Sequence, residues 1–351
     1  MITIASRTKG LLFFIRTAAF LSVLFPITVR SAQTSEGAPK YHSAGIILIK
    51  GQGGWDALSI DPASHLLFVS HSDRVVVIDT RKNQVIREIL DTPGVHGIAL
   101  APDLNRAFSS NGQASTVSVI DLQSFKTRTK IKVGQKPDAI VYEPRSHEVY
   151  AFNGDSHSVS VIDAKAERVV TTVDLPGSPE FAVVDAARHQ IFVNIEDKDS
   201  VAAIDTVTHK VSVMWEIEGC TGPSGIALDA ENQRIFSVCE NQKMVMLDAT
   251  NGKSLASVPT GEGTDGADFD PASGLAFSSN GKSGTITVAK ETSPEHLAVV
   301  QTVQTQRGAR TLVLNPQDHR LYLPTADFHP AEAGSRPTPV DGSQRVLIFE
   351  P

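Results

Sequence analysis

Cysteine is scarce in this chain, which has two cysteines, Cys220 and Cys239, among 351 residues. Two cysteines cannot build a four-cysteine zinc or iron–sulfur site, and the C-x-x-C-H sequence that attaches haem does not occur. The G-x-S-x-G, H-E-x-x-H, Walker and EF-hand motifs are also missing. The enzyme classes that these motifs define are therefore excluded, and function must be sought in another feature of the sequence.

A long uninterrupted hydrophobic run is missing as well. The most apolar stretch, Leu11–Val29, follows two basic residues, is split by Arg16, and ends before the small residues Ser31 and Ala32. This pattern predicts a signal peptide over residues 1–32. The alternative is an N-terminal membrane anchor, but Arg16 leaves no clean run of about 20 residues to span a bilayer. No cysteine follows the apolar stretch, so a lipoprotein is not expected.

Positive charge is in short supply once the predicted signal peptide is removed. Residues 1–32 contain four of the 32 Lys and Arg residues and none of the 39 Asp and Glu residues, which leaves 28 basic against 39 acidic groups, a net charge of −11. An acidic surface repels phosphate, so general nucleic-acid binding is not expected. We expect a periplasmic or extracellular monomer with no membrane span after cleavage, and the sequence does not identify its small ligand or protein partner.

What the sequence does contain is a repeat of 40 to 45 residues. Its copies share a short apolar strand, a turn, a second apolar strand, a polar loop and a β-branched third strand that ends in Ile-Asp. The copies begin at Ala57, Gly97, Ala139, Phe181, Gly225, Gly266 and Thr311. Third strands are expected at Val75–Asp79, Val117–Asp121, Val159–Asp163, Val201–Asp205 and Val245–Ala249. Four short strands in each repeat of this length predict a seven-bladed β-propeller of four-stranded antiparallel blades.

The two ends of the chain complete the seventh blade. The last copy has no fourth strand, because Val346–Glu350 matches a third strand and the chain stops at Pro351. The segment Ala44–Lys50 precedes the first copy and has the pattern of a fourth strand. We therefore predict that the N-terminal strand closes the ring and protects blade edges that would otherwise aggregate. The expected organisation is a signal peptide at 1–32, a flexible segment at 33–43 and the propeller at 44–351.

Three of the repeats carry a family resemblance. The segments FVSHSDRVVVID, FSSNGQASTVSVID and AFNGDSHSVSVID are similar to the YVTN-type β-propeller repeat of the YncE-like group of exported proteins. Blade six departs from the pattern at Ile286–Lys290, and blade four carries the usual asparagine one place earlier, at Asn194. The resemblance covers about residues 44–351 and implies an extracytoplasmic propeller. It implies no single chemistry, because related propellers include scaffolds, lactonases, lyases and oxidoreductase domains.

The candidate site is the set of residues that immediately precede the seven copies. In a propeller these positions converge at one end of the central channel, and here they are Asp56, His96, Asp138, Glu180, Ser224, Asp265 and Arg310. The loops between second and third strands open on the same face and add His71, Asn111, Asn153, Glu240 and Asn280. Gathered carboxylates are costly unless they are paired or bind a cation. They therefore predict a cation or cationic-ligand site; capping of loop backbones is the structural alternative.

Three functions agree with this set. The first is a ligand-binding or interaction scaffold without catalysis, which we favour. The second is a metal-assisted hydrolase or lyase, lactonase-like, in which a divalent metal in the funnel polarises a carbonyl and a carboxylate or His96 moves the proton. The third, an accessory redox propeller, lacks a haem or quinone ligand set. Metal content of the purified protein separates the first two, so the cofactor is left open as a divalent metal or none.

Two further features accompany the ring. The long loop Ala326–Gln344 of blade seven is rich in proline and glycine, so we expect an irregular cover over the funnel, with His329 able to reach that face. Cys220 lies in the loop that enters blade five, and Cys239 ends the second strand of that blade. Antiparallel pairing brings both to one end of the blade, and export supplies oxidising conditions. A disulfide is therefore predicted, with two buried thiols as the alternative.

Overall fold

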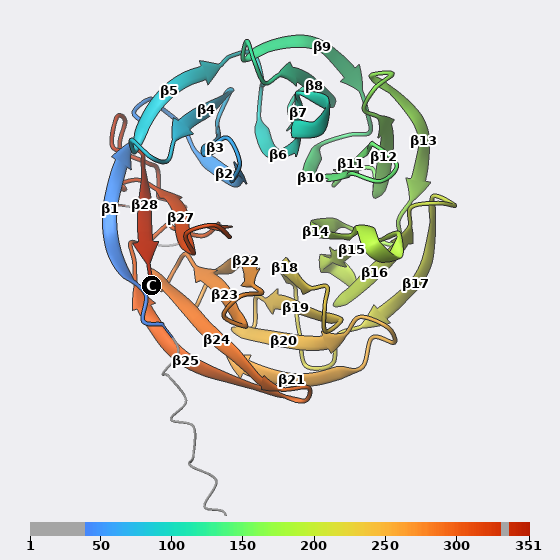
Figure 1. Ribbon diagram of the computed structural model, residues 1–351, viewed down its shortest axis with the longest axis vertical. Helices are drawn as coiled ribbons and strands as arrows, with labels where there is room; N and C mark the ends of the chain where they lie inside the picture. Colours follow the sequence, from blue (N-terminus) through green and yellow to red (C-terminus); the bar gives the residue numbers. More distant parts are fainter. Residues whose placement is uncertain (1–38, 331–336) are drawn as a thin grey trace, which may run out of the picture. The chain divides into compact units, whose positions relative to one another are not determined.

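The computed structural model describes residues 39–330 and 337–351. These residues form seven four-stranded antiparallel sheets arranged in a ring, which confirms the predicted seven-bladed β-propeller (Figure 1). The predicted signal peptide lies outside the described residues. Within the described part of the chain, no helix is long and apolar enough to cross a membrane.

Each blade runs from an inner strand at the central channel to an outer strand at the rim. The inner strands are β2 (Trp55–Asp61), β6 (Val95–Ala101), β10 (Pro137–Glu143), β14 (Pro179–Asp185), β18 (Pro223–Asp229), β22 (Thr264–Asp270) and β26 (Val313–Asn315). The second strands are β3 (Leu66–His71), β7 (Arg106–Asn111), β11 (Glu148–Asn153), β15 (Gln190–Ile195), β19 (Arg234–Cys239), β23 (Leu275–Asn280) and β27 (Arg320–Thr325).

The third and outer strands complete each sheet. The third strands are β4 (Arg74–Asp79), β8 (Thr116–Asp121), β12 (Ser158–Asp163), β16 (Ser200–Asp205), β20 (Lys243–Asp248), β24 (Thr285–Ser293) and β28 (Arg345–Glu350). The outer strands are β5 (Gln84–Ile89), β9 (Lys126–Lys132), β13 (Arg168–Asp174), β17 (Lys210–Glu216), β21 (Ser254–Pro259), β25 (His296–Gln304) and β1 (His42–Leu48). Three short 3-10 turns lie between strands, η1 (Pro102–Leu104), η2 (Ala186–Arg188) and η3 (Glu196–Lys198).

The N-terminal strand closes the ring as predicted. Strand β1 pairs antiparallel with β28, from His42 opposite Glu350 to Leu48 opposite Arg345. The predicted flexible segment 33–43 ends too late, because β1 starts at His42 and Tyr41 is already buried. The Tyr41 hydroxyl donates to the carbonyl of His319, so the chain is anchored to blade seven just before the closing strand.

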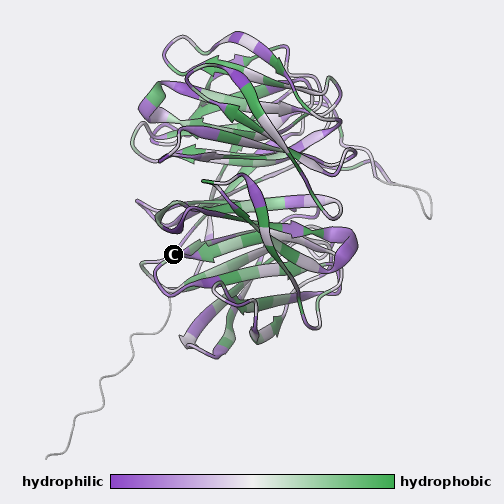
Figure 2. Cartoon of the chain, turned by 90° about the vertical axis from the view of Figure 1, so that its right-hand side faces the viewer, coloured by the Kyte–Doolittle hydropathy of each residue, from purple (hydrophilic) through white to green (hydrophobic). Residues whose placement is uncertain are grey.

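The hydrophobic core lies between neighbouring blades. The middle strands are buried on both faces; Val75, Val76, Val77 and Ile78 of β4 have no exposed surface. Outer strands instead alternate between exposed and covered residues, as in β9 and β13. Hydrophobic colouring accordingly follows the strands, and hydrophilic colouring gathers mostly in the connecting loops (Figure 2). Burial on both faces requires β-branched and aliphatic side chains, which explains the valine-rich third strands.

The aspartate that ends the third strand stabilises the following turn. Asp121 accepts from the backbone N–H groups of Gln123 and Ser124 at 3.1 and 2.7 Å, and Asp205 accepts from Val207 and Thr208 at 3.0 and 2.7 Å. These hydrogen bonds favour the carboxylate, and the backbone N–H of Ser124 makes the largest contribution to lowering the pKa of Asp121. These aspartates therefore have a structural role in the turns that follow the third strands.

Several strand boundaries differ from the prediction by one or two residues. The third strand of blade five was expected at Val245–Ala249, but β20 covers Lys243–Asp248 because it continues the register of the pairing with β19. The inner strand of blade seven is only three residues long, and Arg310 lies outside it. This blade is therefore the least regular part of the channel wall.

Candidate functional site

The predicted ring positions are the places where the inner strands are irregular. Asp56, His96 and Asp138 are each the second residue of their inner strand, and the same position is taken by Glu180, Ser224 and Asp265. The pairing register with the second strand shifts at this point in all six blades. A bulge at a strand end re-aims a side chain. The repeat therefore turns six equivalent residues out of the ladder, and Arg310 joins them from the loop before β26.

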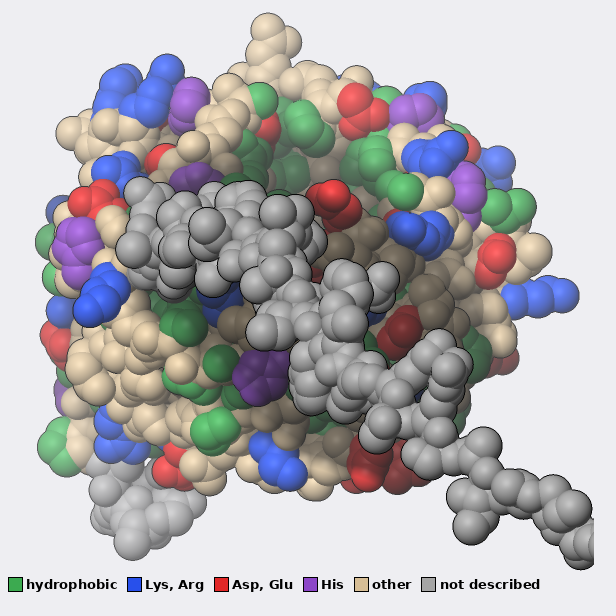
Figure 3. Space-filling view, turned by 60° about the horizontal axis from the view of Figure 1, so that its bottom comes forward, with side chains coloured by type: hydrophobic (Ala, Val, Ile, Leu, Met, Phe, Trp, Pro, Cys, Tyr) green, Lys and Arg blue, Asp and Glu red, His purple; other side chains and the backbone are tan. Residues whose placement is uncertain are grey.

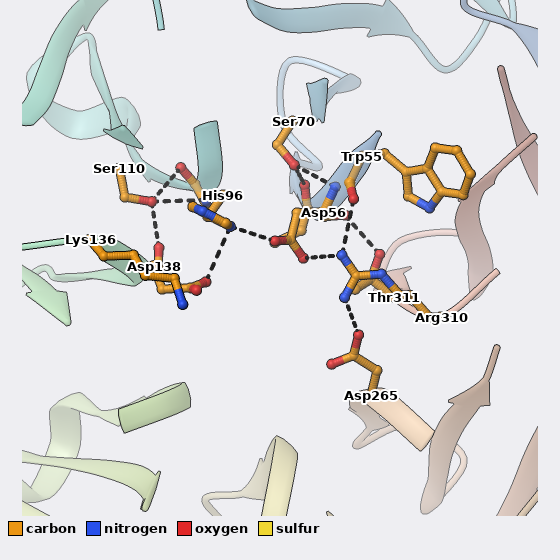
Figure 4. Close-up of polar contacts among 12 residues, drawn as sticks. Trp55, Asp56, Ser70, His96, Ser110, Lys136, Asp138, Asp265, Arg310 and Thr311 are labelled. Carbon is orange, nitrogen blue, oxygen red and sulfur yellow. Dashed lines mark hydrogen bonds and ion pairs between the residues drawn. The ribbon is translucent and has the colours of Figure 1, made fainter. Parts of the chain in front are cut away.

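A continuous chain of contacts links most of the ring. His96 Nδ1 lies 2.7 Å from Asp56 Oδ2 and 3.6 Å from Asp138 Oδ1. Arg310 Nη2 donates to the other oxygen of Asp56 at 3.2 Å, and its Nη1 pairs with Asp265. Figure 4 shows Asp56 between the imidazole and the guanidinium. The two cationic groups thus converge on Asp56, while Asp265 shares only the guanidinium.

Hydroxyl groups from the second strands hold the ring backbone in place. Ser110 accepts from the Gly97 N–H at 2.9 Å and donates to the Asp138 carbonyl in the next blade. Ser279 donates to the Arg310 carbonyl in the same way, and Thr311 Oγ1 donates to the Asp56 carbonyl at 2.7 Å. These hydrogen bonds cross from one blade to the next, so the ring residues stand on a fixed frame.

The side of the ring away from Arg310 carries carboxyl groups that form no ion pair with a described arginine or lysine. Burial, reinforced by the nearby carboxylate of Asp138, raises the pKa of Glu180 to about 8. Burial and the Asp56 carboxylate raise the pKa of Asp138 to about 6, against opposing effects of His96 and Lys136. Glu196 in η3 also has a raised pKa, through burial and then the charge of Glu240. Among the described residues, no side chain or N–H donates to the Glu180 carboxylate, so this part of the funnel favours an added cation.

The paired side of the ring behaves in the opposite way. The hydrogen bond to Asp56 raises the pKa of His96, against the effect of its burial. Arg310 is desolvated, but the charges of Asp56 and Asp265 outweigh this and raise its pKa. Both groups are therefore stabilised as cations; Arg310 pairs with Asp56 and Asp265, His96 is shared between Asp56 at 2.7 Å and Asp138 at 3.6 Å, and neither forms an ion pair with Glu180.

Three predicted ligand residues belong to the core instead. Asn111, Asn153 and Asn280 are fully buried at the ends of their second strands. Each amide donates to two hydroxyls of its own blade; Asn111 Nδ2, for example, donates to Thr116 and Ser118 at 3.1 and 2.9 Å. The prediction that they line the funnel was wrong, because the last residue of the second strand points between the strands of its blade and not toward the channel.

The remaining loop residues also differ in place. His71 is fully buried, burial lowers the pKa of its imidazole, and neither ring nitrogen has a partner among the described residues. It therefore does not line the funnel as predicted. Glu240 is exposed and contributes charge near Glu196, so it lies at the acidic side. His329 is exposed, and its backbone N–H donates to the Thr338 carbonyl at 2.9 Å.

The described part of the blade-seven loop packs beside the ring. Phe328 pairs with Pro339 in an isolated bridge and contacts Trp55, with ring centroids 6.0 Å apart. Trp55 directly precedes Asp56, so the base of the loop stands on the face that carries the ring. Arg345 and Asp327 form an ion pair at the same base. Residues 331–336 lie outside the described part, and the predicted cover over the funnel remains a prediction.

A cavity of about 410 Å³ lies next to the ring, and no pattern in the sequence predicted it. Its wall consists of inner-strand residues, including Leu58, Val141, Val183, Ile226 and Leu312. A second, open hollow of about 480 Å³ lies beside His96 and is lined by polar groups such as Gln135, Lys136 and Asp155.

The sequence-based prediction of the site did not include Glu196. Its position directly after a second strand, together with its acidic side chain, was a usable signal.

One subset of the ring has the geometry of a metal site. Ligand atoms of Asp56, His96 and Asp138 all lie within 4.8 Å of one another. One imidazole nitrogen and two carboxylate oxygens suit zinc, manganese or iron. His96 Nδ1 is, however, already within hydrogen-bond distance of Asp56, so a metal would have to replace that contact.

The disulfide partners lie together at the same end of blade five. Cys220 and Cys239 are bonded, with 5.5 Å between their Cα atoms. The bond ties the loop that enters β18 to the end of β19, next to Glu240. It therefore constrains the loop that leads to Ser224 of the ring.

Comparisons with known proteins agree on the architecture. No family model matches the chain, and no curated protein matches it in sequence. Hydrazine synthase of Kuenenia stuttgartiensis is similar in structure, with a TM-score of 0.70 and 19% identity over 78% of this chain and 92% of that one. The WD40 repeats of RRP9 have a TM-score of 0.73 at 11% identity, covering 89% of this chain and 100% of that chain. U3-55K reaches 0.73 at 12% identity, covering 87% and 98%. At these identities the likeness shows a β-propeller fold and nothing further.

Proposed function

We propose that this protein is a binding propeller whose funnel mouth takes up a cation or a cationic ligand. The observation that carries the proposal is the uneven pairing of the ring. Arg310 and His96 compensate Asp56 and Asp265, while Asp138 and Glu180 stand on the other side without a guanidinium or ammonium partner of their own. Buried like charges are stabilised most effectively by a bound cation.

The surface supports a cationic ligand over a polyanion. Where Figure 3 shows described side chains, Lys and Arg are scattered among acidic and hydrophobic ones. Together with the net charge of −11 expected after removal of residues 1–32, from 28 basic and 39 acidic groups, this argues against general nucleic-acid binding.

Isothermal titration calorimetry of the purified protein tests the proposal directly. The probes are Ca²⁺, Mg²⁺, Zn²⁺ and a series of alkylammonium ions. We expect at least one of these cations to bind, and we expect the combined change Asp138→Asn and Glu180→Gln to weaken that binding at least tenfold. Glu231→Gln is the matched control, because Glu231 is an exposed carboxylate in the turn after β18, away from the ring. Equal affinity in all three proteins would reject the funnel as the site.

A metal-assisted hydrolase or lyase is the second candidate. It is favoured by the cluster of Asp56, His96 and Asp138, whose ligand atoms lie within 4.8 Å of one another. A metal there would polarise a substrate carbonyl, and a ring carboxylate would accept a proton. Metal analysis after purification, followed by lactone and ester assays with and without chelator, decides this candidate. Chelator-sensitive turnover that is lost in His96→Ala would support it.

Export and family membership belong to the same proposal. A signal peptide over residues 1–32 is supported by the basic residues, apolar stretch and small residues near its end, and the repeat sequences support a YVTN-type, YncE-like propeller. The protein would then act as a monomer in the periplasm or outside the cell. N-terminal sequencing of the protein from the extracytoplasmic fraction should start at Ala32 or Gln33. A chain that keeps Met1 and sediments with membranes would indicate an anchor instead.

A further inference from the structure

The central channel below the ring is a cavity with a largely aliphatic side-chain lining. Its volume of about 410 Å³ falls within the range of about 300–1,000 Å³ typical of small-molecule sites. Leu58, Val141, Val183, Ile226 and Leu312 lie on its wall, together with small residues such as Ala182. Contact with these side chains removes apolar surface from water, so the cavity favours an aliphatic group over a hydrated ion.

The cavity is continuous in sequence with the ring. Ala57, Phe181 and Gly266 line it and directly follow Asp56, Glu180 and Asp265 of the ring. A strand advances about 3.3 Å per residue, so the top of the cavity lies within a residue or two of the carboxylates. A ligand of modest length can therefore contact the aliphatic wall and the acidic mouth at the same time.

The carboxyl groups available to a ligand cation lie mainly at the mouth of the cavity. Asp268 is the single ionisable residue on the described cavity wall, and its carboxylate accepts from the backbone N–H groups of Leu314 and Phe269, both at 2.8 Å. Those two hydrogen bonds engage both of its oxygens. The carboxyl groups of Asp138, whose one ion pair is with His96 at 3.6 Å, and of Glu180, which has none among the described residues, are at the mouth.

We propose that the ligand is a small organic monocation whose ammonium group binds at Asp138 and Glu180 and whose aliphatic body occupies the channel. This inference rests on the proposed function, because it names the class of cation that the funnel takes up. It assigns the specificity to the channel and the charge requirement to the ring. A bare divalent metal and a diamine fit this arrangement less well, since the first leaves the channel empty and the second brings another ammonium against an aliphatic wall whose one carboxylate already accepts two backbone hydrogen bonds.

A homologous ligand series tests the proposal. Calorimetric titration uses methyl-, butyl-, hexyl- and octylammonium chloride, with 1-hexanol and 1,6-hexanediamine as controls. Burial of each methylene is worth about 0.8 kcal/mol, so the affinity should rise about fourfold per added carbon until the channel is filled. Hexanol lacks the charge, and hexanediamine carries a second charge into the channel; both should bind at least tenfold more weakly than hexylammonium.

Two kinds of variant separate the channel from the ring. Ala182→Phe fills part of the cavity and should remove the dependence on chain length while methylammonium binds as before. Ala182→Val is the milder change if the larger side chain prevents folding, and should reduce the affinity for octylammonium alone. Asp138→Asn should instead weaken every ammonium ion by a similar factor, and a thermal melt of each variant verifies that it is folded.

The outcomes distinguish this inference from the proposed function. If ammonium ions bind through Asp138 and Glu180 but the affinity does not change with chain length, the channel proposal is wrong and cation binding stands. Equal binding of hexanol and hexylammonium would overturn the role of the ring. If neither ammonium ions nor divalent metals bind, both proposals are wrong.

Discussion

At the scale of single residues, the ring shows one side with matched charges and one side without. Asp56 has His96 Nδ1 at 2.7 Å and Arg310 Nη2 at 3.2 Å, whereas Glu180 receives no hydrogen bond from any described residue. Burying the Glu180 carboxyl without a hydrogen-bond partner costs folding free energy as long as no ligand is bound. Such a cost at a binding site is a common trade between stability and function.

The change Glu180→Gln should therefore stabilise the free protein and weaken cation binding. With a pKa of about 8, the buried Glu180 carboxyl is largely protonated at neutral pH, and folding must pay for the uptake of that proton; removing this requirement is expected to raise the free energy of unfolding by on the order of 1 kcal/mol. Thermal melts and calorimetric titration of the same variant measure both effects. The matched change Glu231→Gln on the exposed turn should alter neither. Destabilisation by Glu180→Gln would mean that this side chain has a structural partner.

Asp268 makes folding stability depend on pH. Burial raises its pKa from 3.8 to about 6, so between these values the folded state binds a proton that the unfolded state has lost. The contribution of this group to stability is therefore greatest below pH 4 and decreases as the pH rises to 6. Urea unfolding of Asp268→Asn should show a flatter pH dependence from pH 4 to 6.5 than the native protein. The same slope in both proteins would show that Asp268 does not titrate in this range.

At the scale of elements, the closing strand and the disulfide each hold one part of the propeller in place. Strand β1 covers the edge of β28, and Cys220–Cys239 holds the loop before β18. Strand β1 comes from the other end of the chain, and the disulfide joins the loop before β18 to the end of β19, so neither contact follows from the repeat alone.

Deletion of Ala44–Lys50 should expose the edge of β28 and cause unfolding or aggregation. A chain that begins at Lys40 keeps β1 whole and serves as the control. Circular dichroism melts and size-exclusion chromatography compare the two. If the deleted protein melts at the same temperature as the control and stays monodisperse, ring closure by β1 does not contribute to stability.

Removal of the disulfide by the paired change of Cys220 and Cys239 to serine should lower the free energy of unfolding by about 3 kcal/mol, as the chain-entropy model gives for a loop of this size. Guanidinium unfolding measures the loss. In a denaturing, non-reducing thiol titration the native protein should show no free thiol. Two free thiols would contradict the bond.

Most strands of the fold could be predicted from the sequence, but only part of the candidate site could. The repeat located the inner, second and third strands and the ring positions, because hydrophobic alternation and turn residues recur at fixed offsets. It misplaced Asn111, Asn153 and Asn280, since a residue at a strand end can point to either face. The pairing of His96 and Arg310 with Asp56 was not predictable, because it depends on the register shifts and on the distance across the funnel.

At the scale of the whole molecule, seven equivalent blades bring seven side chains of five kinds to one mouth above one channel. The fold supplies the position, and the substitutions among blades supply the chemistry. The acidic side of the mouth and the aliphatic channel wall meet within one or two residues on the same inner strands. This juxtaposition is the basis of the account in which a cation binds at the ring.

The most direct measurement is a crystal structure of the protein with hexylammonium, at a concentration that saturates the calorimetric titration. We expect density for the ammonium nitrogen within hydrogen-bond distance of Asp138 and Glu180, with the alkyl chain along Leu58, Val183 and Leu312. Density for the ligand on another surface, with only water between Asp138 and Glu180, would contradict the central claim that the ring binds a cation.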